Sequence, residues 1–140
     1  MKRKNNMEVK LYLLWLRLRW FLFATPISIY IRSPYTIGNH EANAWRSIDV
    51  AEKLFCRGFI PFAPLTHHWW ETKYCHLFKE WIEFDLYWQT KCDIAIRLRG
   101  KSTGADIEEA DGLSRGMPQY TNLKKLYSDF YWYRPDWNKE

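Results

Sequence analysis

The chain has few cysteines, and none of them lies at a spacing typical of redox chemistry or metal binding. Only three occur in 140 residues, Cys56, Cys75 and Cys92, and no Cys-x-x-Cys motif is present. The odd number and the missing motif argue against a disulfide framework. The apolar sequence around Cys56 and Cys92 predicts reduced thiols in the core, and we therefore expect a cytoplasmic protein.

A zinc-binding pattern is also missing. The segment 67–76 contains three histidines and one cysteine, which are His67, His68, Cys75 and His76. Their spacing fits none of the standard zinc motifs. We therefore expect no metal site.

The chain lacks an uninterrupted hydrophobic run long enough to cross a bilayer. The most apolar stretch, 11–24, is 14 residues long, whereas a spanning helix needs about 20. Arg17 and Arg19 interrupt it and also argue against a secretory signal. We expect residues 1–26 to be an extension that forms an extra helix, or translation to start later, at Met7 or beyond. Contact with a membrane is the less favoured alternative.

The composition fits one domain with a sizeable core. Hydrophobic residues make up 47% and aromatic residues 19%, with nine tryptophans, and there is no internal repeat or low-complexity run. The net charge of +5 favours anionic partners, from nucleotides to nucleic acid. Many of the positive charges lie in the first nineteen residues, so the charge does not identify the partner.

Predicted strands alternate with predicted helices along the chain. Strands are expected at 27–32, 59–62, 93–98 and 119–121, and helices at 39–57, 74–91, 105–115 and 123–132, with a loop or short helix at 65–72. This alternation predicts parallel crossovers. The expected fold is an α/β three-layer sandwich, flavodoxin-like or Rossmann-like, with a central parallel sheet of about four or five strands.

The stretch 85–118 contains the most informative polar residues. Asp85 lies late in the helix before a buried strand, and Glu108 lies one turn into the helix after it. Ligands of open α/β sheets bind at the carboxyl ends of strands, where a helix N-terminus offers backbone N–H groups to an anion. These positions predict a binding site formed around the turn 99–104.

Each of these residues also has an ordinary structural interpretation. Asp85 and Glu108 are solvated if their helix faces are exposed, as most charged residues are. The segment 103–106, Thr-Gly-Ala-Asp, fits a capping box and then only starts a helix. Tyr30 in the first strand and Trp69 in the loop are packing residues in the same interpretation.

Five short motifs follow one another along the chain. They are Ile-Tyr-Ile-Arg-Ser-Pro-Tyr-Thr at 29–36, Leu-Thr-His-His-Trp at 65–69, Asp85 eight residues before Asp93, Ser102 six residues before Glu108, and Gly-Met-Pro at 116–118. In this order and spacing they resemble the nucleoside 2-deoxyribosyltransferase superfamily, which includes the 2′-deoxynucleoside 5′-phosphate N-hydrolases. The resemblance covers roughly residues 27–122. It leaves the N-terminal extension 1–26 and a C-terminal helix with an aromatic tail, 123–140, outside this domain.

The resemblance implies an enzyme that cleaves N-glycosidic bonds, by hydrolysis or by base transfer, without a metal or an organic cofactor. Glu108 matches the nucleophile that attacks C1′ of the sugar, and Asp85 matches the acid near the base. Tyr30 matches the tyrosine that orients the nucleophile. We expect the N-terminus of its helix to keep Glu108 ionised and apolar surroundings to raise the pKa of Asp85.

Ser102 departs from the members of the superfamily that act on free nucleosides, which have Asp at this position. A carboxylate at this position would repel a 5′-phosphate, whereas a hydroxyl group leaves room for one to bind. This difference favours a nucleoside 5′-monophosphate as substrate. The residues that the resemblance implies for substrate or phosphate binding are Ser102, Thr103, Gly104, Pro34, Tyr35, His67 and Trp69.

The resemblance also implies a homo-oligomer, a dimer or larger, in which a neighbour completes the site. An alternative is a protein of the same fold that binds a nucleotide without cleaving it, as a sensor or a sponge. Binding to nucleic acid has little support from motifs, and membrane binding is not expected. Released base, measured over a panel of nucleosides and monophosphates, separates the enzyme from the binder.

Overall fold

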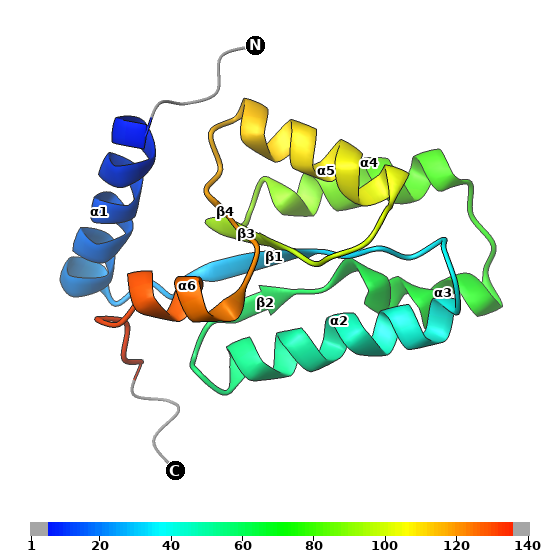
Figure 1. Cartoon of the computed structure of the whole chain (residues 1–140), viewed down its shortest axis with the longest axis horizontal. Helices are drawn as coiled ribbons and strands as arrows, with labels where there is room; N and C mark the ends of the chain where they lie inside the picture. Colours follow the sequence, from blue (N-terminus) through cyan, green and yellow to red (C-terminus); the bar gives the residue numbers. More distant parts are fainter. Residues whose placement is uncertain (1–5, 136–140) are drawn as a thin grey trace.

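The sheet has four strands, and all neighbouring strands are parallel. The computed structural model describes residues 6–135. The strands lie in the order β2-β1-β3-β4. They are β1 (Ser28–Arg32), β2 (Ile60–Phe62), β3 (Ile94–Arg97) and β4 (Gln119–Tyr120). The predicted α/β class with a central parallel sheet is confirmed (Figure 1).

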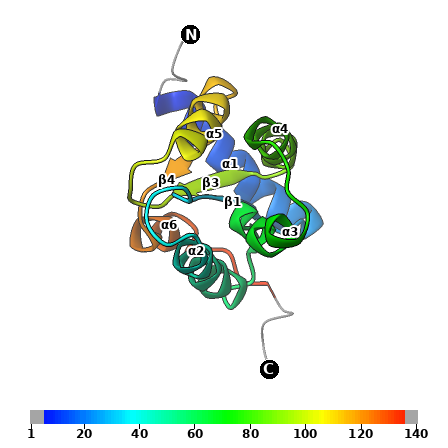
Figure 2. The same ribbon diagram turned by 90° about the vertical axis from the view of Figure 1, so that its right-hand side faces the viewer.

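Helices cover both faces of this sheet (Figures 1 and 2). On one face lie α4 (Phe78–Gln89) and α5 (Thr103–Ser114). On the other face lie α2 (His40–Phe55), the short 3-10 helix η1 (Pro64–Thr66), α3 (His67–Lys73) and α6 (Leu123–Asp129). The N-terminal helix α1 (Asn6–Phe23) lies beside the ends at which the strands begin.

The two central strands are apolar on both sides. Residues 29–31 of β1 and 94–96 of β3 are almost completely buried. Such a continuous apolar run is typical of parallel strands that are covered on both faces. The register places Tyr30 between Phe62 and Ala95, and its ring stacks on Phe62 with centroids 5.6 Å apart.

The strand order reverses between β1 and β3. The chain leaves β1 through α2 and returns on one side as β2, whereas it leaves β3 through α5 and returns on the other side as β4. Since α2 and α5 lie on opposite faces, the loops after β1 and β3 diverge and leave a crevice between them. Ligands of open α/β sheets bind in this position.

α1 is attached to the sheet by a buried leucine and by an ion pair. Leu16 is fully buried in the core. Arg19 donates through both terminal nitrogens to the carboxylate of Asp93, at 2.8 Å each. The same carboxylate accepts a hydrogen bond from the backbone N–H of Ser28 at 2.9 Å, so Asp93 joins α1 to the starts of β1 and β3. None of the described helices is long and apolar enough to cross a membrane.

The single helix predicted at 74–91 is wrong in its first part. α3 ends at Lys73, and Tyr74 has an extended backbone, with φ −131° and ψ 101°. α4 begins only at Phe78, where the Glu80 side chain accepts a hydrogen bond from the backbone N–H of Leu77 at 2.7 Å. A local bond of this kind sets a helix boundary that apolar periodicity does not reveal.

Some positions that were predicted to be in the core are exposed. Cys56 lies in solvent just after α2 and is not a core thiol, while Cys92 is partly buried. Trp45 and Phe55, on the predicted apolar face of α2, are 51% and 58% exposed. The buried residues of α2 are Ala44, Ser47 and Leu54. Small side chains allow α2 to approach the sheet closely, and the large rings remain outside.

Candidate functional site

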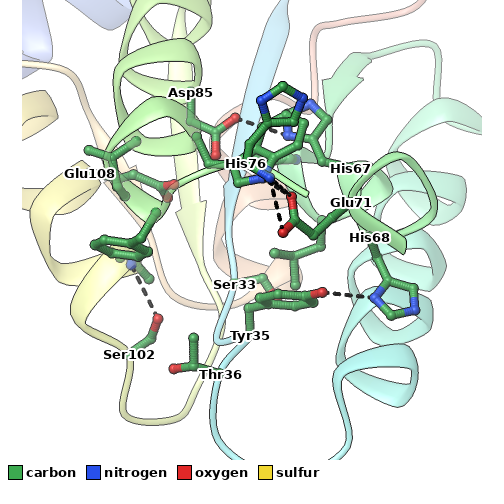
Figure 3. Close-up of a pocket in the computed structure, with 17 residues that line it drawn as sticks. Ser33, Tyr35, Thr36, His67, His68, Glu71, His76, Asp85, Ser102 and Glu108 are labelled. Atoms are coloured by element: carbon green, nitrogen blue, oxygen red, sulfur yellow. Dashed lines mark hydrogen bonds and ion pairs between the residues drawn. The ribbon is translucent and has the colours of Figure 1, made fainter. Parts of the chain in front are cut away.

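A cavity of about 220 Å³ opens at the carboxyl edge of the sheet, where the strand order reverses. Its lining comes from the loop after β1, from η1 and α3, from the connection to α4 and α4 itself, and from the first two turns of α5. Figure 3 shows the side chains that point into it. The polar groups on which its chemistry depends belong to Ser33, His67, Glu71, Asp85, Ser102 and Glu108.

Asp85 lies on α4, and its side chain faces the cavity (Figure 3). The residue is 8% exposed. Burial raises the pKa of Asp85 to about 8, and the negative charge of Glu108 acts in the same direction. The expected rise is confirmed, so this carboxyl group holds a proton at neutral pH.

Glu108 enters the cavity from the second turn of α5 and is 6% exposed. Burial raises the pKa of Glu108 to about 7, while Tyr30, Arg32 and Arg97 lower it. The N-terminus of α5 was expected to help keep Glu108 ionised. The net effect of the surroundings is nevertheless a raised pKa, because burial outweighs the three residues that lower it. Of Asp85 and Glu108, Glu108 is the one with described cations near it, Arg32 and Arg97, and these favour its anionic form.

Tyr30 lies under the cavity rather than in its lining. The residue is fully buried, and burial raises the pKa of its hydroxyl group well above the usual value, with Glu108 and Asp85 adding to the rise. The hydroxyl group faces Glu108 and lowers its pKa, although the contact is outside regular hydrogen-bond geometry. Tyr30 is thus near both carboxyl groups. Its role in orienting Glu108, which the resemblance implies, stays a prediction.

Arg32 is the residue that the sequence argument missed. Its side chain ends the central strand and is fully buried. The guanidinium group donates to Gln89 Oε1 at 2.8 Å, to Gln119 Oε1 and to the sulfur of Met117 at 3.2 Å. Gln89 in turn donates to the backbone carbonyl of Glu108 at 2.9 Å. In the sequence, a charged residue at the end of an otherwise apolar strand could have indicated that Arg32 is buried next to the site.

His67 is the neighbour of Asp85 on the opposite wall. Its Nδ1 lies 3.3 Å from Asp85 Oδ1, but Oδ1 makes no hydrogen bond within the described residues. The imidazole stacks on Trp81 with ring centroids 4.7 Å apart and planes 17° apart. Burial lowers the pKa of His67, so the ring is neutral at pH 7 and leaves the proton of Asp85 in place.

Ser102 lies at the start of α5 and is buried at the lower end of the cavity in Figure 3. Its Oγ accepts a hydrogen bond from the backbone N–H of Ala105 at 3.2 Å. Ser102 is therefore the N-cap, and the capping box predicted from Thr103 is wrong. Gly104 also lines the cavity, and no side chain there narrows the approach to the helix N-terminus.

Of the remaining residues that were expected to bind substrate, one lines the cavity and three lie outside its lining. Tyr35 lines the cavity and its hydroxyl lies 2.8 Å from His68 Nδ1. Pro34 is buried behind the lining, and Thr103 is exposed on α5. Trp69 is 40% exposed and packs edge-on against Trp45, 5.2 Å away. Among the described residues, Pro34, Thr103 and Trp69 are outside the lining.

Glu71 and His76 also line the cavity, and no motif indicated a role for Glu71. The Glu71 carboxylate accepts a hydrogen bond from the backbone N–H of His76 at 3.1 Å and another from Trp81 Nε1. It thereby holds the 74–77 connection against α4. Glu71 follows His67 by four residues in α3, and this helical spacing was the signal that both share a face.

No group of three or more His, Cys, Asp or Glu side chains within residues 6–135 is placed to hold a metal ion. No family model, curated protein or solved structure matches the chain. The chemistry of the site is therefore inferred from the residues that form the cavity.

Gly112 provides space for the buried guanidinium group. A Cβ atom at Gly112 would overlap Arg32, whereas a Cβ atom at Gly104 on the same helix would only reach ordinary contact, 3.5 Å from Ile82. Because its three partners hold Arg32, we expect Gly112→Ala to lower the free energy of unfolding by about 1–3 kcal/mol in urea titrations. Gly104→Ala is the control and should be neutral or stabilising. Equal stability of the two variants would contradict this role of Gly112.

The raised pKa of Asp85 makes stability depend on pH. The pKa rises from 3.8 to about 8 on folding, so the folded state binds more protons between these values. Its stabilising contribution is complete below pH 4 and is lost as pH rises towards 8. The free energy of unfolding should therefore fall as pH rises from 4 to 8, and the share due to Asp85 is on the order of a few kcal/mol. Asp85→Asn should remove this share and leave the share due to Glu108.

Urea titrations of Asp85→Asn and the parent at several pH values from 4 to 8.5 measure this difference. Asp49→Asn, on an exposed position of α2, is the control and should keep the parent's profile. Parallel curves for Asp85→Asn and the parent would show that Asp85 holds no extra proton in the folded state.

Proposed function

We propose that the protein cleaves the N-glycosidic bond of a nucleoside or deoxynucleoside, or of its 5′-monophosphate. The observation that carries the proposal is one cavity with two buried carboxyl groups of different acidity, Asp85 at about 8 and Glu108 at about 7 in pKa. This bond breaks when one group protonates the departing base and another captures the electron-poor C1′. The arginines near Glu108 favour its anionic form, and this difference in surroundings assigns the roles.

Asp85 is the acid and Glu108 is the nucleophile in this scheme. A carboxylate oxygen of Glu108 attacks C1′, the bond from C1′ to the base nitrogen breaks, and the base leaves with the proton of Asp85. The sugar is then esterified to Glu108. Water, or a second base in a transfer reaction, attacks C1′ and releases the glutamate, while Asp85 regains a proton from the attacking molecule.

The surroundings of the two groups support this division of roles. Arg32 and Arg97 attract the anionic form of Glu108, while burial favours the neutral form of Asp85. His67 of α3 and Trp81 of α4 stack on each other beside Asp85, and together they form an aromatic part of the lining against which a planar base could pack. The base and the proton that it needs would thus meet on one side of the cavity.

The N-terminus of α5 supports a 5′-phosphate at the other end. Ser102 and Gly104 line the cavity there, while Asp106, the acidic residue of the same turn, is outside the lining that the described residues form. Backbone N–H groups at a helix N-terminus favour an anion. A monophosphate is therefore the preferred form of the substrate in our proposal.

Glu108→Gln keeps the size and hydrogen bonding of the side chain and removes the anion. We expect the rate of base release to fall at least about 1,000-fold, because removal of a covalent nucleophile commonly lowers the rate by that much. Base release from deoxynucleoside monophosphates, followed by chromatography, measures it. The adjacent Glu109 is outside the cavity lining and pairs with Arg97 Nε at 3.3 Å, so Glu109→Gln is the matched control and should lose less than about tenfold.

A slowly turned-over 2′-fluoro analogue adds a direct measurement. Peptide mass spectrometry should find the sugar attached to the peptide that contains Glu108, and the attachment should be absent in Glu108→Gln. Near-normal turnover by Glu108→Gln, or an adduct on Asp85, would refute the assignment. Binding of a monophosphate by the parent without any release of base would replace the enzyme with a nucleotide-binding protein.

Ser102 tests the charge of the substrate. Ser102→Asp retains an N-cap oxygen but places a carboxylate beside the proposed phosphate position. We expect kcat/KM for monophosphates to fall about 100-fold relative to free nucleosides, through like-charge repulsion. Ser102→Asn also caps a helix and adds no charge, so it is the matched control and should keep the preference for monophosphates. A parent that prefers free nucleosides would disprove the phosphate site.

A further inference from the structure

The outward side of α1 is apolar over its whole length. The residues that define this side, called the α1 outer face below, are Leu11, Leu14, Trp15, Leu18, Phe21 and Leu22. Each of them is between 48% and 63% exposed. The opposite side of the helix is apolar too, and it packs on the core through Tyr12, Leu13, Leu16 and Trp20. A helix that is apolar on both sides is typical of a buried position.

The spacing of the α1 outer face fits a second helix. Its residues recur at steps of three and four, from Leu11 to Leu22, which places them in one stripe along the helix. Stripes of this spacing pack side chains into the gaps of a facing helix. The exposure of these side chains shows that no other described helix covers this stripe, and α1 lies at the left-hand edge of the molecule in Figure 1.

The surface extends beyond α1 by way of Arg17. The guanidinium carbon of Arg17 lies 5.8 Å from the centre of the Phe21 ring and 5.7 Å from that of Tyr131, and Tyr131 is 63% exposed. Aromatic residues and arginine are enriched in protein–protein interfaces. An arginine held between two rings of the surface would be costly to bury in lipid acyl chains.

The size of this surface matches half of a dimer interface. The outer face together with Tyr131 exposes on the order of 800 Å², if each side chain has roughly 150–250 Å² in total. The largest apolar patch of a typical monomer is about 300–600 Å², whereas a standard interface buries about 800 Å² on each partner.

We propose that the α1 outer face is the interface of a homodimer, in which α1 packs against α1 of a second copy. A second copy presents the same stripe of the same length, and a two-fold axis makes such a surface complementary to itself. The cavity lies at the opposite ends of the strands from α1 (Figure 1). Both cavities would therefore remain open in the dimer, and the proposal is independent of the reaction.

Sedimentation velocity of the full chain from about 1 to 100 µM tests the interface. The parent should sediment as a dimer, and Leu14→Glu/Leu18→Glu as a monomer, because each interface would then bury four carboxylates without partners. Its circular dichroism should be unchanged, since both side chains are solvent-exposed in one copy. Tyr87→Glu, at a position on α4 that is 58% exposed, is the matched control and should remain a dimer.

A monomeric parent at 100 µM would overturn the proposal, as would a dimer that survives in Leu14→Glu/Leu18→Glu or is lost only in Tyr87→Glu. A parent that binds vesicles of anionic phospholipid as a monomer would replace the second copy with a membrane surface.

Hydroxyl-radical footprinting of the parent needs no variant and tests the same interface if the double variant fails to fold. Oxidation of Trp15 and Phe21 should fall several-fold between 1 and 100 µM, whereas oxidation of Tyr87 should not change. Equal oxidation of Trp15 at both concentrations would refute the α1 interface.

Discussion

The candidate site depends on a positive charge that is buried at the end of the central strand. The guanidinium group of Arg32 makes its hydrogen bonds to two amide oxygens and a sulfur. A buried cation with neutral partners is costly, and burial accordingly lowers the pKa of Arg32, while Glu108 and Glu109 raise it. The charge is thus stabilised by carboxylates at longer range. Arg32 connects β1 to α4, to β4 and to the segment before β4, and Gln89 extends this network to Glu108 of α5.

The charge of Arg32 makes the surroundings of two chemically similar side chains, Asp85 and Glu108, different. Asp85 and Glu108 are both buried in the wall of one cavity, and burial raises both pKa values. Arg32 and Arg97 offset part of the effect at Glu108 only. Two carboxyl groups in different environments are suited to different steps of one reaction, one as proton donor and the other as anion. The proposed assignment of acid and nucleophile follows from this asymmetry.

The topology places the cavity and the exposed side of α1 at opposite ends of the strands. The reversal of strand order between β1 and β3 opens a crevice at their carboxyl ends. α1 is attached at the amino ends, where Asp93 binds Arg19 of the helix and Ser28 of the first strand. One end is therefore available for a substrate and the other for association, and neither has to be disturbed for the other to act.

The sequence by itself determined the alternating elements, the parallel sheet, and the positions of Asp85, Ser102 and Glu108 near one strand end, because apolar periodicity and chain order fix these features locally. Only the tertiary structure decided the exposure of Cys56 and Trp45 and the burial of Arg32 among Gln89 and Gln119. It also decided that burial raises the pKa of Glu108 although Arg32 and Arg97 lower it. These outcomes depend on distances between residues far apart in the chain and on how much water their packing excludes, and no local pattern encodes either quantity.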